Sequence, residues 1–238
     1  MTRPKGRFFL PGLLYDLAFA AAMRGLRRRV AAAVEGGGLW PWLDVCCGTG
    51  SQLRGVKRGF KRGHVPSVRV PDREAGIPDT GRAGRLAVGL DLSLDFVRYA
   101  AAWAPEVPFV CGDAAALPFK AGAFRAVSVS FGLHDKSGET RGAMMAEARR
   151  VLAPGGRLIA VDFESPWSRR SRRGAFMVHI IERMAGGDHY RNGRNFLRRG
   201  GLKAFLGEHG FVETARRDVE SASISVVRAR PGEEGNDG

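Results

Sequence analysis

The sequence predicts an α/β fold in which a mainly parallel, seven-stranded sheet carries helices on both faces. Short apolar runs typical of strands alternate with helical stretches along most of the 238 residues, and strands separated by helices indicate βαβ units. A glycine turn directly follows the first apolar run. The chain is long enough for one substantial core, so we expect a single domain over residues 1–230.

The predicted elements follow one another in a regular order. A helical segment at about 12–35 precedes the first strand. The predicted strands are Trp40–Cys46, Leu86–Asp91, Pro108–Cys111, Ala126–Ser130, Arg157–Phe163, Phe211–Arg216 and Ile224–Arg228. The predicted helices between them are Leu94–Trp103, Thr140–Leu152 and Leu202–His209.

Three segments interrupt or follow this pattern. Residues 55–85 are rich in Gly, Pro and Arg without a sustained period, which predicts a basic surface insertion. Residues 165–203 leave the carboxyl end of the fifth strand, where a lid over a ligand would begin. The polar tail 231–238 is expected to be disordered.

The turn after the first strand reads Leu-Asp-Val-Cys-Cys-Gly-Thr-Gly and ends at Gly50. Gly48 and Gly50 lack the Cβ atoms that would hold a ligand away from the backbone, and the following helix directs its first N–H groups at that ligand. Asp44 is a carboxylate within an apolar strand, so it either organises the turn or reaches a ligand's ammonium group. A dinucleotide-binding turn has a third glycine where this chain has Leu53.

Polar residues also end the next three predicted strands. Asp91 is followed by Leu92, Asp113 by Ala114, and Ser130 ends the fourth strand. Ligands of parallel sheets bind at the carboxyl ends of the strands, and a carboxylate there suits a ribose diol. Each aspartate alone could equally cap the next helix. Three successive polar strand ends favour a Rossmann-like site for a nucleoside-containing cofactor.

Four ordered motifs resemble those of class I S-adenosylmethionine-dependent methyltransferases. They begin at Asp44, Gly89, Gly112 and Glu147. Within that superfamily, Ser-Phe-Gly-Leu-His-Asp at 130–135, Val-Asp-Phe-Glu-Ser-Pro at 161–166 and Tyr15-Asp16 resemble the ubiquinone/menaquinone C-methyltransferases. The resemblance implies S-adenosylmethionine as cofactor and a lipid-soluble quinone, such as demethylmenaquinol, as substrate. It implies cofactor contacts at Tyr15, Thr49, Asp91, Asp113, Ala114 and Ser130.

The chain departs from that family at His134, where the family motif has arginine. Histidine can gain or lose a proton near neutral pH, so His134, steered by Asp135, is a candidate base that deprotonates a ring hydroxyl. The alternative is that His134 only bonds the following loop. His189 and Tyr190 are a second candidate catalytic pair.

The net charge of +14 is concentrated in residues 1–30, 54–85 and 164–203. Such surfaces meet phosphates, so peripheral contact with an anionic membrane is expected and nucleic acid stays an alternative partner. Alternatively, the basic residues are solvated faces only.

No apolar run is long enough to span a bilayer, and Pro11, Tyr15 and Asp16 interrupt the apolar N-terminal region. We therefore expect a cytoplasmic protein that can work at the inner membrane face, with no metal site and with its three cysteines in packing roles. Other functions stay open: a methyltransferase for another small molecule, a phospholipid amine or RNA, or a non-catalytic cofactor-binding module.

Overall fold

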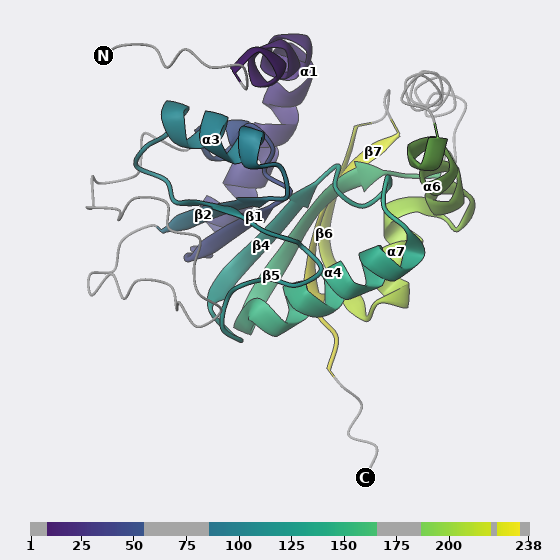
Figure 1. Cartoon of the computed structure of the whole chain (residues 1–238). Helices are drawn as coiled ribbons and strands as arrows, with labels where there is room; N and C mark the ends of the chain where they lie inside the picture. Colours follow the sequence, from purple (N-terminus) through teal and green to yellow (C-terminus); the bar gives the residue numbers. More distant parts are fainter. Residues whose placement is uncertain (1–8, 55–85, 166–186, 220–222, 234–238) are drawn as a thin grey trace.

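The computed structural model describes residues 9–54, 86–165, 187–219 and 223–233. They form a seven-stranded sheet of order β3-β2-β1-β4-β5-β7-β6 (Figure 1). The first five strands are parallel, whereas β7 runs antiparallel to β5 and β6 antiparallel to β7. The strands are β1 Trp42–Val45, β2 Ala87–Asp91, β3 Phe109–Cys111, β4 Phe124–Ser130, β5 Leu152–Phe163, β6 Phe211–Val219 and β7 Ile224–Pro231. The predicted mainly parallel sheet is confirmed.

Helices cover both faces of this sheet, as predicted. They are α1 Phe9–Gly36, α2 Ser51–Arg54, α3 Leu94–Trp103, α4 Gly138–Val151, α6 Gly187–Arg198 and α7 Gly201–Glu208. One apolar cluster joins α1 and α3 to the sheet around Trp42 and Phe109. The other joins α4, α6 and α7 to the opposite face around Phe124 and Phe205. The two clusters hold the sheet between two helical layers (Figure 1).

The first glycine turn lies where the strand order reverses. β1 pairs with β2 on one side and with β4 on the other, so the turn after β1 opens at the topological switch point of the sheet. Ligands of such sheets bind in the crevice at this point. The carboxyl ends of β1, β2, β4 and β5 therefore bound one candidate site.

The largest differences between the predicted and the observed elements concern β5 and α6. β5 begins at Leu152 rather than Arg157, because Phe124 of β4 pairs with Leu152 before the register shifts. Helix α6 was not predicted, since most of its residues are polar and few are apolar. The predicted insertion 55–85 and the part of the predicted lid at 166–186 lie outside the described residues. Across the described ranges, no helix combines the length and apolar character needed to cross a bilayer.

Candidate functional site

The turn after β1 is built by left-handed backbone at three positions. Cys46, Gly48 and Gly50 have φ of 57°, 53° and 68°. A Cβ on Gly48 would meet nothing within 4 Å, so the backbone there is open to a ligand. A Cβ on Gly50 would lie 2.7 Å from Ala100 Cβ and 2.8 Å from the Phe109 ring. Gly50 therefore allows the turn to pack on α3 and β3, whereas Gly48 leaves room for a ligand.

Asp91 connects this turn to the end of β2. Its Oδ2 accepts a hydrogen bond from Gly48 N at 2.8 Å, and its Oδ1 accepts one from Ser93 N at 2.9 Å. Each carboxylate oxygen has two lone pairs, so capacity remains for two hydroxyl donors. The neighbouring Leu92 side chain is 71% exposed. A ribose diol on Asp91 with an apolar ring on Leu92 fits this arrangement.

Asp44 is a buried carboxylate with a single neutral side-chain donor. Ser128 Oγ donates to Asp44 Oδ1 at 2.5 Å and accepts from Trp42 Nε1 at 2.7 Å. Burial raises the pKa of Asp44 from 3.8 to about 7, although the bond from Ser128 opposes the shift. A cation beside Asp44 would favour its ionised form, so this carboxylate suits an ammonium group.

A pocket surrounds Asp44 and the turn. Its lining comes from α1, the β1 turn and the ends of β4 and β5: Leu26, Arg27, Val30, Asp44, Cys46, Cys47, Gly48, Thr49, Ser51, Gln52, Ser130, Phe131 and Val161. Ser130 Oγ is buried there without a hydrogen-bond partner among the described residues. Such an orphaned hydroxyl is unfavourable unless a ligand satisfies it. Open backbone at Gly48, an ionisable Asp44 and an unpaired Ser130 together fit the methionine end of S-adenosylmethionine.

Thr49 and Tyr15 differ from the other expected cofactor contacts. Thr49 Oγ1 donates to Asp16 Oδ1 at 2.6 Å, so its hydroxyl joins the turn to α1. Asp16 also accepts hydrogen bonds from Arg54 and Tyr99. The Tyr15 side chain lies outside the described residues. The sequence indicated Asp16 only as part of the Tyr15-Asp16 motif, and its bond to Thr49 joins α1 to the turn.

Asp113 and Ala114 lie where β3 ends, as predicted, but they face different surroundings. Asp113 is exposed, and its Oδ1 accepts from Ala115 N at 2.8 Å. Ala114 is only 8% exposed and packs in the core. An adenine amino group could reach the free lone pairs of Asp113, whereas any contact with Ala114 would involve its backbone.

The cysteines beside the turn have packing roles. Burial raises the pKa of Cys46 to about 12 and that of Cys47 well above its ordinary value. Both thiols are therefore protonated near neutral pH and are poor nucleophiles. A Cβ on Gly132 would lie 2.8 Å from Cys46 Sγ, so Cys46 fills the space beside the loop after β4.

His134, in that loop, is held by a carboxylate that sequence reasoning missed. Its Nδ1 lies 2.8 Å from Asp162 Oδ1, and both side chains are buried. Asp162 also accepts backbone N–H bonds: Oδ1 from Phe163 at 2.8 Å and Oδ2 from Leu133 and His134 at 3.1 and 3.3 Å. The position of Asp162 within a buried strand was the available signal, as it was for Asp44.

The expectation that Asp135 steers His134 was wrong. Asp135 Oδ2 binds Lys136 Nζ at 2.6 Å and lies 3.8 Å from His189 Nδ1. Asp135 lies against α6, where Asn192 Nδ2 donates to its backbone oxygen at 2.9 Å. Asp162 takes the expected role because β5 runs beside β4 and brings its end under the loop.

His189 and Tyr190, the second expected catalytic pair, lie in different surroundings. The His189 ring lies 5.5 Å from the His134 ring, in an edge-on arrangement. Tyr190 instead lies under the Arg194 guanidinium, which is 5.7 Å from its ring centre, and lines a different cleft. Only His189 of this pair lies beside the His134–Asp162 pair.

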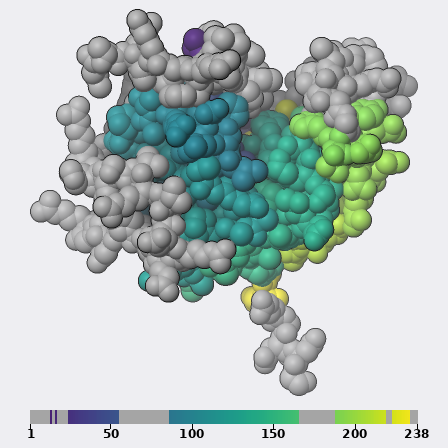
Figure 2. Space-filling view, in the orientation of Figure 1, coloured from purple at the N-terminus to yellow at the C-terminus, as the bar shows by residue number. Residues whose placement is uncertain are grey.

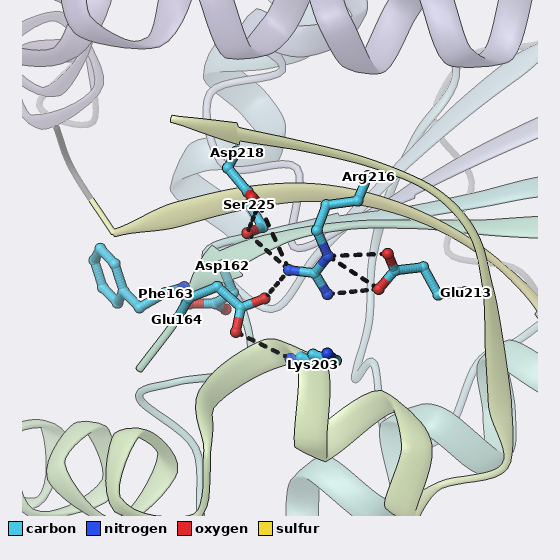
Figure 3. A network of polar contacts seen from close by, with 8 residues as sticks. All are labelled: Asp162, Phe163, Glu164, Lys203, Glu213, Arg216, Asp218 and Ser225. Atoms are coloured by element: carbon cyan, nitrogen blue, oxygen red, sulfur yellow. Dashed lines mark hydrogen bonds and ion pairs between the residues drawn. The ribbon is translucent and has the colours of Figure 1, made fainter. Parts of the chain in front are cut away.

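A polar network fixes the end of β5 (Figure 3). Arg216 on β6 binds the buried Glu164 and also Glu213, while Glu164 Oε2 accepts from Lys203 N at 3.2 Å. Burial opposes the charge on Arg216, but its bonds to Glu213 and Glu164 outweigh that effect and raise its pKa above the ordinary value. The network ties β5, β6 and α7 together two residues after Asp162.

Comparison with known proteins finds methyltransferases among the matches. A model described as a methyltransferase domain matches residues 76–160. A demethylmenaquinone methyltransferase of Renibacterium salmoninarum is 38% identical over 108 residues, 44% of this chain and 45% of the relative. One of Beutenbergia cavernae is 31% identical over 183 residues, 71% of this chain and 75% of the relative. The aligned part thus spans less than half of the first relative and three quarters of the second.

A solved methyltransferase structure has a similar fold. N-methyltransferase NodS from Bradyrhizobium japonicum, in complex with S-adenosylhomocysteine, aligns with a TM-score of 0.57 at 11% identity, covering 88% of this chain and 87% of that chain. At that identity the similarity concerns the fold alone.

Proposed function

The chain belongs to the demethylmenaquinone methyltransferase family, and from this premise we propose that it transfers a methyl group from S-adenosylmethionine to a ring carbon of a prenylated hydroquinone such as demethylmenaquinol. The observation that carries the chemistry is the buried His134–Asp162 pair next to the cofactor pocket. Carbon methylation of a hydroquinone needs extra electron density on the ring, and a base that removes a hydroxyl proton supplies it.

The cofactor contacts follow from the three carboxylates at the strand ends. Asp91 would accept the ribose hydroxyls, while Asp44 and Ser130 would receive the charged methionine end. Asp113 would accept from the adenine amino group. When bound, the cofactor supplies an electrophilic methyl group on sulfur. These contacts would hold the cofactor beside the turn after β1, and such positioning supplies much of the rate enhancement in this kind of transfer.

His134 would act as the base and Asp162 as its positioning residue. A carboxylate that accepts from Nδ1–H fixes the tautomer in which Nε2 is the proton acceptor. Asp162 also favours the protonated ring once Nε2 has taken the hydroxyl proton. Phe131 and Phe163 flank the His134 ring, with centroids at 6.5 and 4.7 Å. This apolar enclosure suits a hydrophobic ring substrate.

The proposal is tested with purified protein, labelled S-adenosylmethionine and demethylmenaquinol in detergent. We expect His134→Gln to lower kcat by roughly 100-fold or more with little change in cofactor affinity. The matched control is His209→Gln, since His209 lies at the end of α7, away from the cofactor pocket. A pH–rate profile unchanged by His134→Gln would remove His134 as the base.

The same assay separates the rival acceptors. Label is offered in parallel to demethylmenaquinol, phosphatidylethanolamine, tRNA and a whole-cell small-molecule extract. Incorporation confined to tRNA or to the phospholipid amine would overturn the quinone assignment. Failure to bind S-adenosylmethionine at all would overturn the enzymatic proposal as a whole.

We also propose that the protein works at the inner face of the cytoplasmic membrane, where a prenylated substrate resides. The net charge of +14 supports this placement, as do the exposed Arg24, Arg28 and Arg29 on α1. Activity on quinol in vesicles should rise when phosphatidylglycerol is added to phosphatidylcholine. Equal activity in both kinds of vesicle would contradict the membrane placement.

A further inference from the structure

A second cleft, separate from the cofactor pocket, lies between the start of α4 and the outer face of α6. It measures about 680 Å³, and in the space-filling view α6 (green) stands beside the β4–α4 region (teal-green) on this face (Figure 2). The residues that line it are largely basic or hydrogen-bonding: Ser137, Gly138, Arg141, Tyr190, Arg191, Asn192, Arg194, Asn195, Arg198 and Arg199. The catalytic proposal uses none of these residues.

Arg141 is the central feature of this cleft. It is only 3% exposed, and its Nε has no hydrogen-bond partner among the described residues. Its Nη2 donates to Asn195 Oδ1 at 3.1 Å, and its guanidinium lies 5.2 Å from the centre of the Phe196 ring. Burial lowers the pKa of Arg141, and the charge of Arg199 adds to that effect. A buried guanidinium with unused donor capacity is stabilised by an anion.

The surrounding charges are only partly neutralised. Arg191 forms an ion pair with Asp188, and Arg199 forms one with Glu208. Within the described ranges, neither Arg194 nor Arg198 has an ion pair; Arg194 donates only to the Tyr190 hydroxyl, at 3.4 Å. The positive charge in the cleft therefore exceeds the negative charge supplied by these carboxylates.

The start of α4 adds a favourable dipole. Ser137 caps this 14-residue helix by accepting from Thr140 N, and a Cβ on Gly138 would meet nothing within 4 Å. The first N–H groups of a helix attract anions. Glu139 in the first turn opposes this attraction, but the arginines outnumber it.

We propose that this cleft binds a phosphate group. Several guanidinium forks around one helix N-terminus match the tetrahedral, multiply charged oxygens of phosphate better than a single carboxylate. The phosphate could belong to a soluble mono- or diphosphate or to an anionic lipid headgroup. A ligand there would contact both α4 and α6, and so would hold the helix that carries His189 against the loop of His134.

The full chain is titrated with inorganic pyrophosphate as the soluble probe, and calorimetry measures the Kd. The buffer contains about 0.15 M salt to screen non-specific attraction. We expect Arg194→Gln/Arg198→Gln to raise the Kd at least about tenfold, because two charged donors are removed. The matched control is Arg125→Gln/Arg217→Gln, which removes the same charge from exposed strand positions outside the cleft. The control should change the Kd by less than about twofold.

A second arm identifies the source of the phosphate. Sedimentation compares phosphatidylcholine vesicles with vesicles that also contain phosphatidylglycerol. Loss of both pyrophosphate and vesicle binding in Arg194→Gln/Arg198→Gln would assign a lipid headgroup, and loss of pyrophosphate binding alone would assign a soluble phosphate. Arg141→Lys keeps the charge but removes the planar fork, and we expect weaker pyrophosphate binding from it as well.

Two results would overturn the proposal. One is that neither probe binds more weakly to Arg194→Gln/Arg198→Gln than to the parent. The other is that the control pair weakens binding to the same extent, which would indicate general attraction to a basic protein. Methyl transfer to the quinol is measured in parallel, so that failure of this site is distinguishable from failure of the enzymatic proposal.

Discussion

Two buried aspartates, one on β1 and one on β5, differ in how many hydrogen-bond donors surround them. Asp44 on β1 accepts a side-chain hydrogen bond from Ser128 and lines the cofactor pocket. Asp162 on β5 accepts from His134 Nδ1 and from the backbone N–H groups of Leu133, His134 and Phe163. The first keeps acceptor capacity for a ligand, whereas the second uses its capacity within the protein.

This contrast separates a binding carboxylate from a positioning one. Exposure does not distinguish them, since both are at most 2% exposed. The number of hydrogen-bond donors to each carboxylate distinguishes them. Asp91, with two backbone N–H donors, is intermediate: it shapes the turn and still has lone pairs for a ribose. Substitutions at these three positions should therefore differ in kind as well as in size.

The largest functional effect is expected from Asp162→Asn. The amide would place an NH₂ group against N–H donors, so the loop of His134 should shift and kcat should fall by roughly 100-fold, with the free energy of unfolding lowered by about 3 kcal/mol. Steady-state kinetics and urea unfolding measure these changes.

A structural role alone would lower stability without moving the pH–rate profile. A negative charge beside the His134 ring favours its protonated form, so the acid limb of kcat/KM should move to lower pH in Asp162→Asn. An unmoved acid limb would contradict the positioning role. Asp162→Glu, which keeps the charge, should recover part of kcat.

Asp91→Ala should have the next largest effect, on binding rather than on kcat. Its loss removes both the ribose acceptor and the bond that orients Gly48 N, so the Kd for S-adenosylmethionine should rise by about 30-fold. Calorimetry measures the Kd. Asp95→Ala, in the first turn of α3, removes a similar charge and is the control. An unchanged Kd in Asp91→Ala would reject the ribose contact.

Asp44→Asn should have the smallest effect on function. Unlike Asp162→Asn, it should raise the free energy of unfolding near neutral pH and above. Because the folded pKa is about 7 and the ordinary value is 3.8, the folded protein retains a proton that the unfolded chain has released. The contribution of Asp44 to stability therefore falls as pH rises from about 4 to about 7 and is level above that range. Asp44→Asn should remove this decline and be more stable than the parent at about pH 8, while its Kd for cofactor rises only about tenfold.

Thermal unfolding over this pH range checks the prediction. Ser128 can still donate to the side-chain amide oxygen of the Asp44→Asn variant, so local packing is kept. Equal pH dependence in Asp44→Asn would show that another group is responsible.

The sheet was predictable because its determinants are local. Apolar runs, a glycine turn and strand-terminal carboxylates each need only a few consecutive residues, and they specified Asp44, Gly48, Asp91 and Ser130 correctly as neighbours at one edge of the sheet. The seven strands were found with boundary errors of a few residues, the largest at β5, where pairing with Phe124 extends the strand through two glycines.

The partners of His134 were not predictable because they depend on which strands become neighbours. Asp135 is adjacent in sequence, but the backbone after β4 directs it to Lys136 and α6. Asp162 is distant in sequence, and the pairing of β5 with β4 brings it beside His134. Helix α6 escaped prediction for a related reason: Asn192 and Asn195 on it bind polar groups, so its contacts do not follow an apolar period.

Gly50 carries a consequence for how this family can change over time. The space that its Cβ would take is filled by Ala100 of α3 and Phe109 of β3, so the shape of the cofactor turn depends on two residues that lie in the core behind it. A larger residue at position 100 would press on the turn even though no ligand is near. Drift at positions 50, 100 and 109 should therefore be correlated among relatives, and an alanine at position 50 would need smaller side chains at positions 100 and 109 and would still be strained by the left-handed backbone.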